Sequence, residues 1–151
     1  MKAISVKQPW AYMLVDGAKT VEVRSWPTTH RGPLLICAAA APHNCFWDDG
    51  EEKRLLHAGC MIGVVDVLDC RKMTKADDDA SLGNYKAGMY AWVTKPVGFC
   101  QPIAIKQKLN LFDVPDGRIL MLHEDIDVEW LFDYPHPQGE VKLTARCPII
   151  G

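Results

Sequence analysis

Short stretches of the chain either alternate apolar and polar residues or are apolar throughout, and both patterns are typical of β-strands. The stretches predicted as strands are residues 3–6, 20–26, 34–39, 61–68, 90–93, 101–105 and 141–147. A helical spacing follows the first of them, where Trp10, Met13 and Leu14 lie three and four positions apart. Pro9 is suited to begin this helix and Gly17 to end it. Many short strands with few helices predict a mixed α/β (α+β) fold, a small β-barrel with flanking helices.

The other segments give weaker patterns. Residues 48–58 place charges outward and Leu55 and Leu56 inward, which predicts a surface helix. Residues 71–88 contain three consecutive aspartates and two glycines, so they predict a loop with about one helical turn. The strands at 90–93 and 101–105 are expected to pair around a turn, and 141–147 to form a closing edge strand, whereas residues 119–134 match neither period.

The composition is that of a folded protein, with 48% hydrophobic and 24% charged residues among 151. This length suits one domain over residues 1–151, and we expect a monomer. No apolar run approaches the roughly 18 residues of a membrane span. Polar residues interrupt the N-terminus too early for a signal peptide. The sequence therefore predicts a cytoplasmic protein that does not bind membranes.

Six cysteines occur, and none forms a Cys-x-x-Cys pair. Several lie in apolar stretches, as Cys37 does, and are interpreted as small core side chains. The alternative is a metal site made of His43, Cys45, His57 and Cys60, but their spacing matches no standard zinc pattern. Neither a metal nor a cofactor is predicted.

Charge is distributed unevenly along the chain, although the formal net charge is only −2. Residues 1–41 carry five basic side chains and two acidic ones, whereas residues 111–140 carry one arginine and eight acidic side chains. Proteins that bind long nucleic acids usually show a broad basic surface. Any contact with phosphate is therefore expected to be local.

Residues 17–24, Gly-Ala-Lys-Thr-Val-Glu-Val-Arg, match the Gly-x-Lys-x-x-Glu-x-Arg signature of the ASCH domain family. Further blocks resemble the family in the same order, at residues 4–11, 24–36 and 90–106. The chain is thus similar to an ASCH domain, with a divergent insertion at about 42–58 and a divergent C-terminal tail at about 115–151.

The resemblance implies a PUA-like fold, a cleft between barrel and helices, and a role in RNA metabolism or transcriptional coactivation. Some members of the family are reported as ribonucleases, and one branch removes acyl groups from modified cytidine. That branch pairs the motif lysine with a threonine where this chain has Glu22, a departure that puts deacylation in doubt. Because a fold does not fix a function, each site residue is assessed by its own chemistry.

Strand alternation places Glu22, Arg24 and Trp26 on one face of their strand. An arginine fork fits a phosphate or a base edge, and an indole provides a surface on which a nucleobase stacks. Glu22 is expected either to accept a hydrogen bond from an exocyclic amine or to orient Arg24. The alternative is a solvated strand on which Glu22 and Arg24 form a weak surface ion pair.

Lys19 is expected at the mouth of the barrel, with its stem packed and its ammonium in the cleft. Partial burial would lower its pKa and suit it to act as a general base, while its simpler role is to attract phosphate. If the protein is an enzyme, Lys19 and Glu22 are its candidate catalytic residues. The further binding candidates are Lys7, Gln8, Trp10, Arg31 and Tyr90, with Lys106 and Lys108 as a possible basic rim.

Three functions remain open at this point. The first is a module that binds RNA or a nucleotide without chemistry. The second is a small hydrolase, either a ribonuclease or an N-acylcytidine-type amidohydrolase, that uses Lys19 and Glu22. The third is a protein-interaction module that docks a partner through the acidic and apolar segment 123–133.

Overall fold

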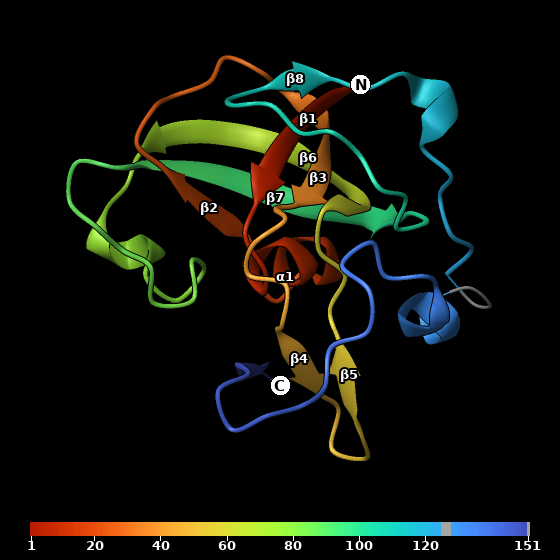
Figure 1. Cartoon of the computed structure of the whole chain (residues 1–151). Helices are drawn as coiled ribbons and strands as arrows, with labels where there is room; N and C mark the ends of the chain where they lie inside the picture. Colours follow the sequence, from red (N-terminus) through yellow and green to blue (C-terminus); the bar gives the residue numbers. More distant parts are fainter. Residues whose placement is uncertain (125–127, 151) are drawn as a thin grey trace.

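The structure is a computed structural model and describes residues 1–124 and 128–150. A six-stranded sheet curls into a half-barrel in which the strand order is β2-β7-β6-β3-β1-β8 (Figure 1). The strands are β1 (Lys2–Val6), β2 (Val21–Arg24), β3 (Gly32–Ala38), β6 (Cys60–Lys72), β7 (Tyr90–Phe99) and β8 (Phe112–Asp113). Neighbouring strands are antiparallel except for the parallel pair β1 and β3.

β7 is longer than the sequence pattern indicated. It runs without interruption from Tyr90 to Phe99, so the prediction that residues 90–93 and 101–105 form two strands around a turn was wrong. Pro96 lies within β7 opposite Val65, where the register with β6 shifts. A proline is tolerated in a strand at such an irregularity, because the missing N–H does not interrupt a regular ladder.

One α-helix, α1 (Trp10–Asp16), packs across the concave side of the curled sheet (Figure 1). Pro9 precedes its first turn, and Gly17 ends it in the left-handed conformation, with a φ of 96°, while its N–H donates to the carbonyl oxygen of Met13. Ala11, Leu14 and Val15 are buried against the sheet. The predicted helix is therefore confirmed, and it supplies one wall of the core.

A second, three-stranded sheet has the order β5-β4-β9 and consists of β4 (Phe46–Asp48), β5 (Lys53–Leu55) and β9 (Ile149–Ile150). The helix predicted for 48–58 was wrong, because Asp48 and Asp49 accept hydrogen bonds from the N–H groups of Gly50, Glu51 and Glu52 and so form a turn between β4 and β5. The divergent insertion and tail thus share one sheet.

The closing edge strand predicted at 141–147 was also wrong. The segment ends in a turn in which the Cys147 N–H donates to the Thr144 carbonyl oxygen, and a strand forms only afterwards, at β9. The loop with one helical turn predicted for 71–88 was confirmed from residue 73 onward, and its turn is the 3₁₀ helix η1 (Lys75–Asp77), whereas Arg71 and Lys72 belong to β6. Two further 3₁₀ helices are η2 (Asp116–Arg118) and η3 (Val128–Asp133).

Five cysteines are buried and Cys70 is partly buried, all as free thiols, which confirms their interpretation as core side chains. Within residues 1–124 and 128–150, no group of three or more His, Cys, Asp or Glu side chains is placed to hold a metal ion. In the same residues no helix is long and apolar enough to cross a membrane.

The proposed docking segment 123–133 falls partly outside the described residues, since 125–127 are not described. Of its apolar side chains, Leu131 is buried in the main core and Phe132 contacts Tyr12, with the ring centroids 5.8 Å apart. Trp130 is exposed. The segment is therefore attached to the domain by Leu131 and Phe132, and it exposes the large apolar side chain of Trp130 to solvent.

Two stacked histidines join the C-terminal tail to the domain. The His57 and His136 rings lie 3.8 Å apart, and His57 Nε2 donates to the carbonyl oxygen of Tyr134 at 2.9 Å. His57 is 3% exposed, and burial lowers its pKa from the ordinary 6.5 to about 4. The folded protein therefore holds His57 neutral at pH values where the unfolded chain already protonates it.

Acidification is therefore expected to destabilise the fold. Since the unfolded state binds the additional proton as the pH falls from 6.5 toward 4, the free energy of unfolding decreases over that range. We expect a loss of about 2 kcal/mol between pH 7 and pH 5, measured by urea denaturation. His57→Gln, which cannot titrate, should be less stable at pH 7 but lose much less on acidification; an equal loss in both proteins would contradict this assignment.

Candidate functional site

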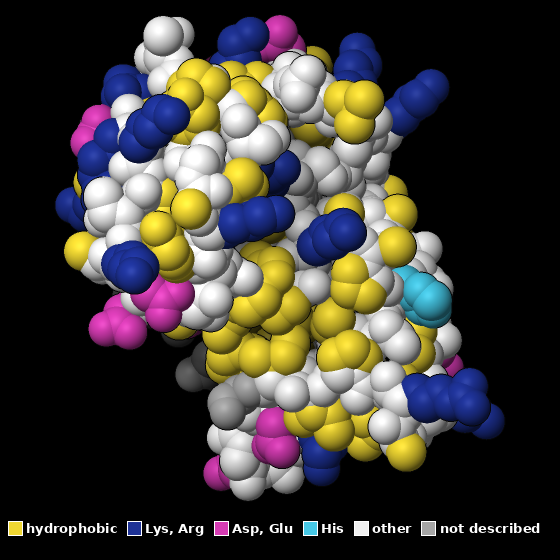
Figure 2. Space-filling view, turned by 90° about the vertical axis from the view of Figure 1, so that its left-hand side faces the viewer, with side chains coloured by type: hydrophobic (Ala, Val, Ile, Leu, Met, Phe, Trp, Pro, Cys, Tyr) yellow, Lys and Arg dark blue, Asp and Glu magenta, His cyan; other side chains and the backbone are white. Residues whose placement is uncertain are grey.

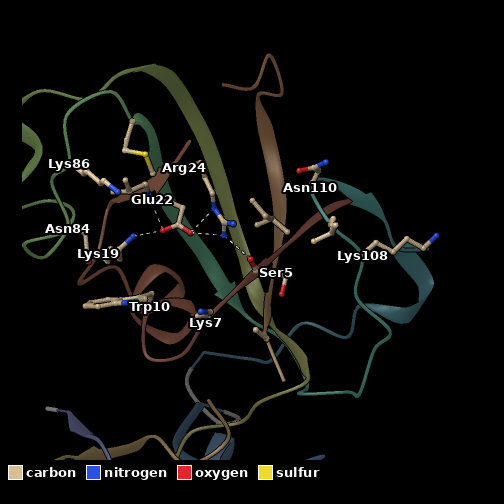
Figure 3. A pocket seen from close by; sticks show the side chains of 15 residues that line it. Ser5, Lys7, Trp10, Lys19, Glu22, Arg24, Asn84, Lys86, Lys108 and Asn110 are labelled. Atoms are coloured by element: carbon tan, nitrogen blue, oxygen red, sulfur yellow. Dashed lines mark hydrogen bonds and ion pairs between the residues drawn. The ribbon is translucent and has the colours of Figure 1, made fainter. Parts of the chain in front are cut away.

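A cavity of about 500 Å³ opens beside the ASCH-like motif segment, and we refer to it as the cationic cavity. β1, β2 and the start of α1 form its base, while residues 84–89 and 108–110 form its rim (Figure 3). The lining residues are Ile4, Ser5, Lys7, Trp10, Lys19, Glu22, Val23, Arg24, Ala39, Asn84, Lys86, Met89, Lys108, Leu109 and Asn110. The motif side chains of Lys19, Glu22 and Arg24 thus line one hollow.

Glu22 lies between the two cationic side chains of the motif. Its Oε1 accepts from Lys19 Nζ at 2.6 Å and from the Val23 N–H at 3.1 Å. Its Oε2 accepts from Arg24 Nε at 3.1 Å and from Arg24 Nη2 at 2.8 Å. A carboxylate has about four lone-pair positions, and all four are occupied here. Glu22 therefore orients Lys19 and Arg24 and has no acceptor position left for an exocyclic amine.

Lys19 is buried more deeply than the sequence indicated, with only 1% of the residue exposed. Its ammonium donates to Glu22 and to the carbonyl oxygen of Val21 at 2.8 Å, which leaves one of its three donors for the cavity. Burial lowers the pKa of Lys19 below the ordinary 10.5, and the contact with Glu22 opposes that shift. Lys19 is thus a desolvated cation fixed by its partner.

Arg24 joins two strands that are not neighbours in the sheet. Its Nη2 donates to the carbonyl oxygen of Ser5 on β1 at 2.8 Å, as well as to Glu22 on β2 (Figure 3). β7, β6 and β3 separate β2 from β1 in the sheet, so this contact crosses the open side of the half-barrel. Within the described residues Nη1 makes no hydrogen bond, and it remains available to a ligand.

Positive charge dominates the cationic cavity. Lys7, Lys19, Arg24, Lys86 and Lys108 line it, against the single carboxylate of Glu22. The formal charge of the lining is therefore +4, while that of the whole chain is −2. Figure 2 shows one face of the molecule, on which Lys and Arg side chains lie around a patch of hydrophobic side chains. The cavity chemistry favours an anionic ligand.

Several rim residues were missed by sequence reasoning. Asn84, Lys86 and Met89 belong to the long segment between β6 and β7, and Leu109 and Asn110 follow Lys108, which was only a secondary candidate. Asn110 has a φ of 60°, in the left-handed region, which an asparagine tolerates better than most residues. Nothing in the local sequence indicates that these two loops face each other across the motif strand.

Four predicted binding residues do not line the cavity. Gln8 is buried: its side-chain Nε2 donates to the His57 carbonyl oxygen, and its Oε1 accepts from the Tyr12 N–H. Trp26 packs edge-on against Trp92, with the ring centroids 4.8 Å apart, because β2 ends at Arg24 and the alternation ends with it.

Arg31 and Tyr90 are the other two. Arg31 donates to the carbonyl oxygens of Thr28 and His30, and the Tyr90 ring lies under Lys72 Nζ at 5.6 Å. Of the predicted binding residues, Lys7, Trp10, Lys19, Glu22 and Arg24 are therefore the ones that the cavity brings together.

Comparison with solved structures identifies the fold. The ASCH protein of Zymomonas mobilis superimposes with a TM-score of 0.50 at 14% sequence identity, covering 77% of this chain and 88% of that one. A serine-to-alanine point mutant of the same protein gives a TM-score of 0.52 at the same identity, covering 76% and 88%. These likenesses confirm the predicted mixed α/β, PUA-like fold, here with a half-barrel sheet and one α-helix.

Sequence comparison gives two relatives. Activating signal cointegrator 1 from Homo sapiens is 41% identical and the same protein from Mus musculus 39% identical, each over 80 residues. The matched part is 44% of this chain and 14% of either relative, so the chain corresponds to a small part of their length. The family model of the ASCH domain matches residues 4–104. The chain therefore belongs to the ASCH domain family.

Proposed function

We propose that the cationic cavity binds a nucleotide, either free or as one unit of a single-stranded RNA. The observation that carries this proposal is the convergence of five cationic side chains and one carboxylate in a cavity of about 500 Å³. Phosphate is the anion that such a set of lysines and one arginine fork favours. A general link of the ASCH family to RNA supports the same class of ligand.

The cavity offers separate groups for phosphate and for base. Arg24 Nη1 and the ammonium groups of Lys7, Lys86 and Lys108 are the groups proposed to contact phosphate. Trp10 provides an aromatic face, on which a stacked base contributes about 1–3 kcal/mol. The side-chain amides of Asn84 and Asn110 carry both donors and acceptors, which suits them to the edge of a base.

Charge reversal at the rim is the test. Lys86→Glu and Lys108→Glu should each weaken binding of a fluorescent single-stranded RNA hexamer about tenfold. Each should also lower the number of salt ions released on binding, read from the slope of log affinity against log salt concentration, by about one. The exposed Lys142 is the control, since it lies outside the cavity lining. Fluorescence anisotropy over a salt series measures both quantities. If Lys142→Glu weakens binding equally, or the rim variants bind as the wild type does, the cavity is not the RNA site.

The same experiment addresses hydrolysis by Lys19 and Glu22. Burial lowers the pKa of Lys19, which favours a base, but its contact with Glu22 favours the protonated ammonium, and that ammonium already donates to Glu22 and Val21. Glu22 accepts four hydrogen bonds and has no free position from which to take a proton from water itself. Binding without chemistry is therefore the better-supported function. RNA recovered from mixtures with the plain hexamer and with a hexamer that carries N-acylcytidine should be intact; cleaved or deacylated product that depends on Lys19 would establish a hydrolase instead.

Three predictions from the sequence extend this proposal. We infer one ASCH domain over residues 1–151, a monomeric state and a cytoplasmic location. The small β5-β4-β9 sheet supports the first, because it joins the divergent insertion to the divergent tail. Size-exclusion chromatography with light scattering measures the oligomeric state and should give the mass of a monomer.

A further inference from the structure

A second cavity lies at the small sheet and differs in chemistry from the cationic cavity. Its volume is about 560 Å³, and we refer to it as the aromatic–acidic cavity. Three aromatic side chains line it: Trp47 on β4, and Trp130 and Phe132 on η3. The lining of the cationic cavity contains none of these residues.

The acidic side chains of this cavity outnumber its basic ones. Asp49, Glu52 and Asp133 line it together with Arg54, so its formal charge is −2. Arg54 already neutralises part of the acidic set, since its Nη2 lies 2.7 Å from Glu52 and its Nε 3.4 Å from Asp49. Asp133, in contrast, has no ion pair within the described residues.

The aromatic wall already holds a cation. The guanidinium carbon of Arg54 lies 5.4 Å from the centre of the Phe132 ring, a distance at which the ring face attracts positive charge. Tyr12 supports this wall from behind, with ring centroids 4.9 Å from Trp47 and 5.8 Å from Phe132. Trp130 is 57% exposed, and its ring makes no aromatic pair or cation contact within the described residues.

We propose that the aromatic–acidic cavity binds a lysine or arginine side chain from a basic segment of a partner protein. The incoming cation lies against Trp130 and pairs with Asp133, next to the Arg54–Phe132 contact that the protein makes itself. Exposed tryptophans are enriched among the residues that contribute most to protein interfaces. The cationic cavity repels the same ligand, so the two sites do not compete.

The shape of the cation distinguishes a peptide from a free polyamine. An arginine guanidinium is planar, so it stacks on an aromatic face and donates two parallel hydrogen bonds to one carboxylate. The ammonium groups of a polyamine are not planar and do neither. The exposed Trp130 beside Asp133 therefore favours an arginine-containing peptide over a free polyamine.

The test uses the full chain and a fluorescent octapeptide of alternating arginine and glycine. Fluorescence anisotropy should show saturable binding to the wild type, which Trp130→Ala weakens at least about fivefold, the loss expected for one cation–π contact. Asp133→Asn should also weaken it. Leu68→Ala, which removes an equally exposed apolar side chain from β6, is the matched control and should bind as the wild type does.

Two further probes identify the ligand class. The same peptide with citrulline in place of arginine keeps the shape but loses the charge, and it should not bind. Spermidine should compete only at far higher concentration than the unlabelled peptide. The proposal is overturned if Trp130→Ala binds normally, if the citrulline peptide binds equally well, or if spermidine matches the peptide. RNA binding by each variant, measured in parallel, should be unchanged.

Discussion

Glu22→Ala is expected to lower the free energy of unfolding by about 3 kcal/mol and to abolish detectable binding of RNA in the cationic cavity. The reason lies in Lys19, which is 1% exposed and whose ammonium loses its only carboxylate partner within the described residues. A buried cation without a counter-charge costs several kcal/mol. Arg24 loses two hydrogen bonds at the same time, so its guanidinium is no longer oriented. Urea denaturation and RNA titration measure the two effects.

A double replacement separates charge from packing. Lys19→Met with Glu22→Leu removes both buried charges and keeps similar volumes, and such exchanges are often neutral for stability. We therefore expect this double variant to recover most of the stability lost in Glu22→Ala, yet still to bind RNA poorly. If Glu22→Ala loses less than about 1 kcal/mol, the pair is effectively solvated and the assignment of a desolvated site is wrong.

Gly63→Ala is expected to destabilise the fold by about 3 kcal/mol, the upper part of the usual range for overpacking. A β-carbon at Gly63 would lie 2.4 Å from the Gly98 carbonyl oxygen and 2.5 Å from Val15 Cγ1. The first neighbour is backbone of β7 and the second belongs to α1, so neither moves without disturbing the contact between helix and sheet. Thermal and urea denaturation measure the loss.

Gly117→Ala is the matched control for this substitution. Its new β-carbon would meet nothing within 4 Å, and the backbone there is not in the left-handed region. Its stability should remain within about 0.5 kcal/mol of the wild type. Equal effects at the two glycines would show that α1 does not pack against β6 and β7 as closely as described.

The sequence predicted those parts of the site that depend on local geometry. Glu22 and Arg24 alternate on one short strand, so their shared face follows from the period of two alone. Trp26 falls two positions further on, but β2 has ended, and its ring turns into the core against Trp92. Alternation is informative only as far as the strand extends, and the sequence does not mark where β2 stops.

The rest of the site depends on contacts between distant segments. Lys86 and Lys108 line the cavity from loops on opposite sides of the motif, and no local pattern distinguishes them from other surface lysines. The same dependence on distant contacts explains why the helix predicted for residues 48–58 was wrong, although the charges and leucines of that segment fit a helix. There, the carboxylates of Asp48 and Asp49 accept hydrogen bonds from backbone N–H groups and so favour a turn, and pairing with the distant β9 stabilises β4, the strand that precedes this turn.

The contact from Arg24 to Ser5 fixes the shape of the cationic cavity before any ligand arrives. It ties the outermost strand of one sheet edge to a strand near the other, so the cost of ordering Arg24 is met during folding. A ligand that enters finds Lys19 and Arg24 already oriented, whereas the exposed Lys7, Lys86 and Lys108 become ordered only when it binds. Recognition by this domain should therefore start at a rigid base and be completed by a rim that adapts to the ligand.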